Sequence, residues 1–166
     1  MLRTIVVFAV VVGAAYLIVP HDAGEHPASV SYRQPVRDFA AGASFTVLAP
    51  SALPPGWYAN HVRETESRGV PEDLDAGFYD DPDRTYVALE ESNVPARVFL
   101  RSQGLSGHPG GQVDAAGRRY EVWPGGAGPS RVALVAALPG GGTLVLDGGA
   151  PLPVLLELAQ QLAPTG

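Results

Sequence analysis

The hydrophobic pattern of the chain begins with fifteen consecutive uncharged residues at positions 5–19. Ten of them are Ile, Val, Phe or Leu, and each such residue favours insertion into a bilayer by roughly 0.3–0.6 kcal/mol, or about 3–6 kcal/mol together. As a helix the run covers roughly 22 Å of a hydrocarbon core about 30 Å thick, so Met1, Leu2 and Thr4 must extend it while Arg3 reaches back to the headgroups. The pattern predicts a short transmembrane helix.

The charges that flank this run predict its orientation. Arg3 and the amino terminus precede it, whereas His21 and Asp22 follow it. The positive-inside rule then places the N-terminus in the cytoplasm and the bulk of the chain outside. We expect a transmembrane anchor at residues 1–20, a polar tether at residues 21–31 and an extracytoplasmic domain at residues 32–166.

Two other interpretations of the same run stay open. Gly13 and Ala15 have the small size and spacing that signal-peptide cleavage requires, although such a peptide would be unusually short. The run is also compatible with a buried helix of a soluble domain.

Beyond the tether, the periodicity alternates between helix and strand. A helix is expected at residues 32–42, where Val36, Phe39 and Ala40 share one face, and a second at residues 96–103. Apolar alternation and turn residues predict strands at residues 45–48, 57–66, 75–79, 84–91, 112–114, 118–123, 132–138 and 143–146. A loop rich in glycine is expected at residues 104–111.

The last periodic segment predicts a C-terminal amphipathic helix at residues 152–163. Its apolar stripe consists of Leu152, Leu155, Leu156, Ala159, Leu162 and Ala163. The order of elements indicates an α+β fold, in which this helix and shorter helices pack on a mainly antiparallel β-sheet.

Composition narrows the range of functions. After Arg3 the chain has ten arginines against 17 acidic residues, a net charge of −7 with neutral histidines, and it has no cysteine. So acidic a domain, without a basic stripe, is a poor partner for nucleic acid or an anionic membrane surface. The absence of cysteine excludes disulfides, thiolate nucleophiles and thiolate metal ligands.

Three sets of residues resemble catalytic or metal-binding motifs, but each lacks a feature that its motif requires. The acidic residues between positions 72 and 83 lack the spacing of a calcium loop. Ser106 resembles an esterase nucleophile, but His108 stands where that motif requires glycine. The four histidines include no pair with zinc-ligand spacing. We therefore expect no catalytic residue, metal or cofactor.

Aromatic residues remain as candidates for a ligand surface. Trp57, Tyr79 and Trp123 could line a groove, because aromatic rings combine a large apolar area with a polar handle. Core packing of the same rings is the competing interpretation.

Four local strings carry a resemblance to a known family. They are FTVLAP at residues 45–50, LPPGW at 53–57, GFYD at 77–80 with YVALEES at 86–92, and the closing strand, turn, strand and helix. Together with the anchor they resemble the actinobacterial membrane-anchored family known as domain of unknown function 4245, over nearly the whole chain. The resemblance implies an anchor, a tether and a small extracytoplasmic domain. It implies no activity.

We therefore expect a single-pass membrane protein whose outer domain is a non-catalytic binding or interaction module of the bacterial cell envelope, with a protein or envelope component as partner. One alternative is a module that binds an apolar ligand or lipid. The other is a cell-envelope hydrolase, which would require Asp80, Asp83, His61 or His108 to converge in a deep pocket.

Overall fold

The computed structural model describes residues 29–81, 85–125 and 131–165 of the chain. The predicted anchor and most of the predicted tether lie outside these residues. The described elements, in order, are α2 (Arg33–Gly42), β1 (Leu48–Pro50), β2 (Trp57–Ser67), β3 (Val70–Asp80), β4 (Thr85–Ser92), α3 (Ala96–Ser102), β5 (Gly111–Ala115), β6 (Arg118–Pro124), β7 (Val132–Ala137), β8 (Thr143–Gly148), α4 (Leu152–Gln161) and β9 (Leu162–Pro164). This arrangement confirms the α+β class with an antiparallel sheet and a C-terminal helix.

Seven strands form one antiparallel sheet in the order β2-β3-β4-β8-β7-β6-β5, and β1 and β9 form a separate two-stranded ribbon. Strands β4 and β8 lie at its centre, which agrees with the nearly continuous apolar run of residues 143–146. The predicted hairpin of residues 75–79 and 84–91 is confirmed, with Asp80 paired to Thr85. The turn at Ala116 and Gly117 is confirmed as well, and both residues have positive φ (49° and 71°).

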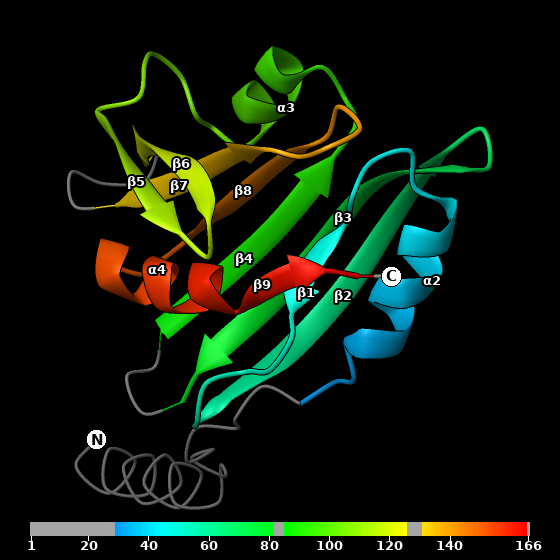
Figure 1. Ribbon diagram of the computed structural model, residues 1–166, viewed down its shortest axis with the longest axis horizontal. Coiled ribbons are helices and arrows are strands. Elements are labelled where there is room, and N and C mark those ends of the chain that lie inside the picture. The colour runs from blue at the N-terminus through cyan, green and yellow to red at the C-terminus, as the bar shows by residue number, and fades with distance from the viewer. Residues whose placement is uncertain (1–28, 82–84, 126–130, 166) are drawn as a thin grey trace, which may run out of the picture.

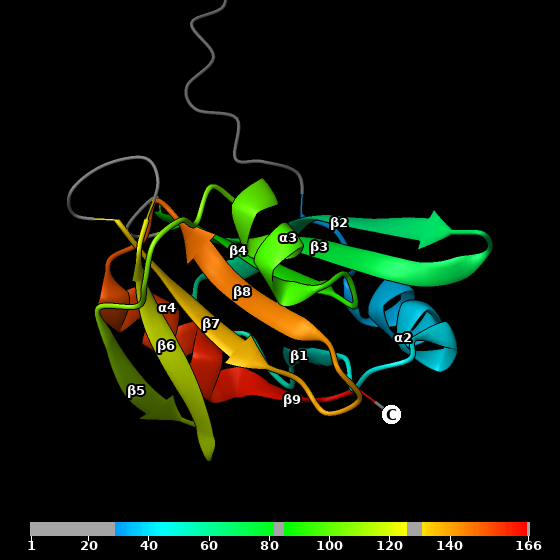
Figure 2. The same cartoon turned by 90° about the horizontal axis from the view of Figure 1, so that it is seen from above.

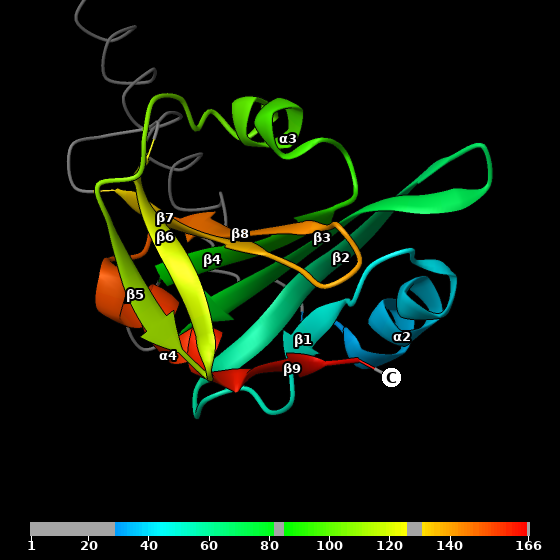
Figure 3. The same ribbon diagram turned by 45° about the horizontal axis from the view of Figure 1, so that its top comes forward.

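The sheet has unequal layers on its two faces. Figure 3 shows α3 alone on one face, with α4, the β1–β9 ribbon and α2 on the other. Figure 1 shows how α4 runs directly into β9, which lies against β1 beside α2. The molecule is therefore a three-layer sandwich with one thick side and one thin side.

The thick side contains the main hydrophobic core. Val36 and Phe39 of α2, Leu155 and Leu158 of α4, and the sheet residue Phe78 are all at most 2% exposed. Full burial of one such side chain contributes roughly 1.5–3 kcal/mol. These contacts fix both helices against the sheet.

The C-terminal helix is shorter than the periodicity predicts. It ends at Gln161, and Leu162 and Ala163 belong instead to β9, where they pair with Pro50 and Ala49 of β1. Backbone pairing with β1 satisfies the polar groups of this segment better than another helical turn could, since Pro164 cannot continue a helix. The helix buries Leu155, Leu158 and Ala159, whereas Leu156 is only partly buried.

Two strands also begin elsewhere than predicted. The strand expected at residues 45–48 is β1, which starts at Leu48, and the strand expected at residues 75–79 is β3, which starts at Val70. The additional part of β3 pairs with β2 through a two-residue turn at Arg68 and Gly69, both with positive φ (56° and 76°). The turn end of this hairpin projects beyond the rest of the sheet (Figure 2).

No helix within the described ranges is long and apolar enough to span a membrane.

Candidate functional site

The short helix α3 covers the thin face of the sheet. Its residue Phe99 and the following Leu105 are buried against Trp123, Ala133, Val135 and Val145, in a hydrophobic cluster separate from the main core. Val98, on the outer side of the helix, is 58% exposed. Because α3 covers only part of this face, cavities remain around it.

One of these cavities, which we call the α3 cleft, has a volume of about 470 Å³ and lies between α3, the loop at residues 104–110 and β6. Its lining residues are Ala96, Arg97, Leu100, Arg101, Leu105, Ser106, Gly107, His108, Pro109, Glu121 and Trp123. This volume lies within the range of about 300–1,000 Å³ that is typical of small-molecule sites. The α3 cleft is therefore large enough to hold a ligand.

The cleft combines an apolar wall with cationic groups. Leu100, Leu105 and Trp123 supply the apolar surface, while Arg97 and Arg101, one helical turn apart, supply two guanidinium groups. Glu121 is the only acidic residue of the lining, and its carboxylate accepts a 3.0 Å hydrogen bond from the indole N–H of Trp123. This bond fixes the indole ring and uses part of the hydrogen-bonding capacity of the Glu121 carboxylate. With two guanidinium groups and one carboxylate, the cleft suits a ligand that has both an apolar and an anionic part.

Beyond α3, the same face of the sheet carries a row of carboxylates. Asp73 and Asp75 come from β3, Glu90 from β4 and Asp147 from β8, and Asp75 lies directly opposite Glu90 in the strand register. Asp75 contacts two side chains of β2, His61 through Nε2 at 3.1 Å and the guanidinium group of Arg63 at 3.6 Å. Glu90 has no such partner among the described residues, and its Oε2 atom is buried without a hydrogen bond.

This environment raises the pKa values of Glu90 and Asp147. Burial, followed by repulsion from Asp147, Asp75 and Asp73, raises the pKa of Glu90 to about 8. Burial also raises the pKa of Asp147, an effect that Arg131 partly offsets, and raises the pKa of Tyr86 to about 12. Glu90 therefore binds and releases a proton near neutral pH.

Two smaller openings connect this row to the C-terminal end of α3. One, of about 140 Å³, is lined by Asp73, Asp75 and Glu90 together with Phe99, Ser102 and Gln103. The other, of about 410 Å³, contains Arg131 and Asp147 beside the same Ser102 and Gln103. Within the described ranges, no three His, Asp or Glu side chains are grouped so that they could hold a metal ion.

The structure does not bring the three aromatic candidates together. Trp57 is buried in the main core on the thick side, and Trp123 is buried in the separate cluster beneath α3. Tyr79 is partly buried on β3, where its ring lies 5.5 Å from that of Tyr58. Of the three, Trp123 alone lines the α3 cleft.

The residues named for a hydrolase are also dispersed. His61 pairs with Asp75 on the thin face, and His108 lies in the loop beside the α3 cleft. Asp80 is buried at the end of β3, opposite Trp57, and Asp83 lies outside the described residues. Arg97 and Arg101 are not among the predicted site residues, although their spacing in a helix without acidic residues is a visible signal.

Comparison with known proteins places the chain in a family without assigning it an activity. Searches of curated proteins and of solved structures found no match to the chain. One family model, described as protein of unknown function (DUF4245), matches residues 1–162 and therefore almost the whole sequence. The chain thus belongs to the family of unknown function DUF4245, the one that its sequence motifs resemble.

Proposed function

We propose that the chain is a single-pass membrane protein whose folded part lies outside the cytoplasm and acts as a non-catalytic binding module of the cell envelope. Residues 1–20 anchor it, residues 21–31 form the tether and the α3 cleft receives the ligand. The apolar run at residues 5–19 and the charges around it support the anchor and its orientation. The family match supports the association of this segment with the domain, since it covers both.

The composition of the α3 cleft is the main support for a binding role. It joins Trp123 and Leu100 to the guanidinium groups of Arg97 and Arg101 in a domain that is otherwise acidic. Guanidinium groups bind carboxylate and sulfonate oxygens through paired N–H donors, while an indole ring provides a flat apolar contact. The ligand class is therefore an anion with an aromatic or apolar body, presented by an envelope component or a partner protein.

Calorimetric titration of the full chain in detergent with 2-naphthoate tests the binding role, with empty micelles as the blank. We expect saturable binding that weakens about tenfold in Arg97→Gln and in Arg101→Gln, because each variant loses one charge-assisted hydrogen bond. Arg119→Gln is the matched control, since Arg119 is exposed and pairs with Asp114 outside the cleft. Equal affinity in all four proteins would refute the assignment of the cleft.

Protease accessibility tests the topology separately. In cells expressing the chain with a C-terminal tag, protease added outside should digest the domain once the outer layers of the envelope are opened. Survival of the tag while the membrane is intact, followed by its loss on lysis, would place the domain in the cytoplasm and refute the proposed orientation.

A further inference from the structure

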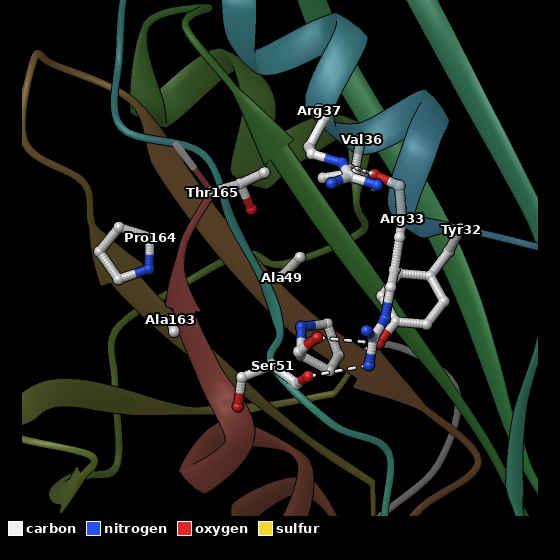
Figure 4. Close-up of a pocket in the computed structure, with 10 residues that line it drawn as sticks. Tyr32, Arg33, Val36, Arg37, Ala49, Ser51, Ala163, Pro164 and Thr165 are labelled. Atoms are coloured by element: carbon white, nitrogen blue, oxygen red, sulfur yellow. Dashed lines mark hydrogen bonds between the residues drawn. The ribbon is translucent and has the colours of Figure 1, made fainter.

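A second pocket lies on the thick side of the molecule, away from the α3 cleft. It has a volume of about 180 Å³ and is bounded by α2 on one side and by the β1–β9 ribbon on the other. Figure 4 shows Arg33 and Arg37 extending from α2, with the side chain of Thr165 directed toward them from just after β9. Ala163 and Pro164 of β9 also line the pocket. We call it the α2 pocket.

The floor of the α2 pocket is apolar and held in place by backbone bonds. Val36 is 1% exposed and Ala49 is 9% exposed, so both are fixed by the core beneath them. The ribbon is continuous across the pocket, because Ala49 pairs with Ala163 and the N–H of Thr165 donates to Val47 O at 2.9 Å. The pocket therefore has a preformed shape, which lowers the ordering cost of binding.

Tyr32 forms one wall and supports the first arginine. Its hydroxyl donates a 2.8 Å hydrogen bond to Pro50 O, and the guanidinium carbon of Arg33 lies 5.9 Å from the centre of its ring. Arg33 donates one hydrogen bond, of 3.0 Å, to Ser51 O. These contacts hold the guanidinium at the rim of the pocket (Figure 4).

The second arginine follows one turn later on α2. Arg37 donates through Nε to Arg33 O at 3.2 Å, so its terminal nitrogens are not used in that bond. Within the described residues neither arginine forms an ion pair, and the nearest acidic residue on the helix, Asp38, accepts a hydrogen bond from Gln34. A guanidinium group has five N–H donors, so both side chains retain donors for a ligand.

We propose that the α2 pocket binds a carboxylate carried on a short apolar stem, either a small monocarboxylic acid or the C-terminal end of a peptide. The two guanidinium groups match the planar carboxylate, and Val36, Ala49 and Ala163 match the stem. A cavity of about 180 Å³ holds such a stem but is too small for most drug-sized ligands, which occupy about 300–1,000 Å³. Among the described residues, no acidic side chain lines the pocket to oppose the charge.

This site is independent of the proposed role of the α3 cleft, because the sheet separates the two. An anion seated in the α2 pocket would contact α2 and the ribbon, whereas a ligand of the α3 cleft would contact α3 and β6. Variants of one site therefore serve as controls for the other, and either proposal can fail alone.

The test is a titration of the full chain in detergent, followed by NMR, with 4-methylpentanoate and with its neutral isostere 4-methylpentanamide. We expect the acid to shift the resonances of Val36, Ala49 and Thr165, and the amide to bind at least tenfold more weakly because it lacks the charge. Arg33→Gln and Arg37→Gln should each weaken binding of the acid about tenfold, whereas Arg97→Gln, on the opposite face, should not change it. Equal affinity for acid and amide, unchanged affinity in both variants, or shifts confined to the α3 cleft would each overturn the proposal.

A second variant tests the pocket without removing a charge. Ala163→Leu should fill the space from the β9 side and abolish binding while both arginines remain, provided that its melting curve shows a folded protein; retained affinity would overturn the proposal. If that variant does not fold, the two arginine variants decide, because both side chains are exposed and make few contacts.

A short peptide ending in leucine then distinguishes the two possible ligands, a peptide C-terminus and a small free acid. Tighter binding than 4-methylpentanoate identifies a peptide end, and equal or weaker binding identifies a free acid.

Discussion

Glu90 is the residue whose replacement tests the electrostatics of the thin face. Its carboxyl group faces Asp73, Asp75 and Asp147, and burial together with their repulsion raises its pKa to about 8 from an ordinary value of 4.5. The folded protein therefore holds a proton on Glu90 between about pH 4.5 and pH 8, where the unfolded chain has lost it. Stability falls as pH rises through this window, because the unfolded chain releases the proton while the folded state retains it.

The size of the effect follows from the same pKa. One pH unit of difference corresponds to about 1.36 kcal/mol, so raising the pKa from 4.5 to about 8 sets a ceiling of about 5 kcal/mol above pH 8. The side chain is only partly buried, so solvent screening and side-chain movement reduce this cost. We expect Glu90→Gln to stabilise the protein by about 2 kcal/mol at pH 9, or about 6–10 °C in melting temperature for a domain of this size.

Thermal unfolding followed by circular dichroism at pH 5, 7 and 9 measures this gain. The difference between Glu90→Gln and the parent should be smallest at pH 5 and grow with pH. Glu157→Gln is the matched control, since Glu157 is exposed on α4 and should not change the pH profile. A Glu90→Gln variant that melts with or below its parent at pH 9 would refute the cost assigned to this carboxylate.

Three further substitutions test the packing and the turns. Leu155→Asp should prevent folding, because it buries an unpaired charge at a position that is 0% exposed, whereas Leu156→Asp, at a partly buried position, should leave a cooperative melting transition. Gly148→Ala should lower the free energy of unfolding by about 2 kcal/mol in urea titrations, since Gly148 has φ of 135° and a Cβ there would meet Tyr86 O; Gly149→Ala, where a Cβ meets nothing, should have little effect. Arg68→Asn should raise the melting temperature through a gain of about 0.5–1 kcal/mol, because asparagine tolerates the positive φ of this turn; a lower melting temperature would contradict the turn assignment.

The central strands and the outer helices are predictable from sequence because a single strong signal governs each of them. Strands β7 and β8 are buried on both faces and therefore read as continuous apolar runs. Helices α2 and α4 pack one face on the sheet, so their apolar positions repeat with the helical period. In each case the local pattern and the tertiary environment favour the same structure.

The β2–β3 hairpin lacks such a signal. Its outer half, from Glu64 to Asp73, is mostly exposed and polar, and its turn has arginine where asparagine or aspartate would identify a hairpin. The predicted end of α4 is wrong because the local signal is misleading. Leu162 continues the helical period of apolar residues, but it pairs as a strand residue with Pro50. Whether this segment forms a helix or a strand depends on the position of β1, which is set by tertiary structure and cannot be inferred from the local sequence.

The candidate site was predictable only in fragments. Trp123 could be predicted as a site residue from its residue type. The same reasoning selects Trp57, which lies in the main core on the other face of the sheet, because residue type does not show which face a side chain lies on. Arg97 and Arg101 line the cleft because Phe99 holds α3 on this face of the sheet. A site formed by a short helix on one face of a sheet depends on topology more than on any local motif.

The carboxyl group of Glu90 is a reason to look for function on the thin side. On the thick side the fully buried Glu91 has a structural partner, since both of its oxygens accept hydrogen bonds from the N–H of Leu48 at 3.0 and 3.1 Å, which ties β1 to the sheet. On the thin side Glu90 has an unpaired buried oxygen among like charges, a cost that a neutral residue would remove. Residues that lower stability and make no structural contact in exchange are typical of binding surfaces, because selection for stability alone would replace them. The stability gained by Glu90→Gln is therefore a measure of what the fold gives up to keep this face polar.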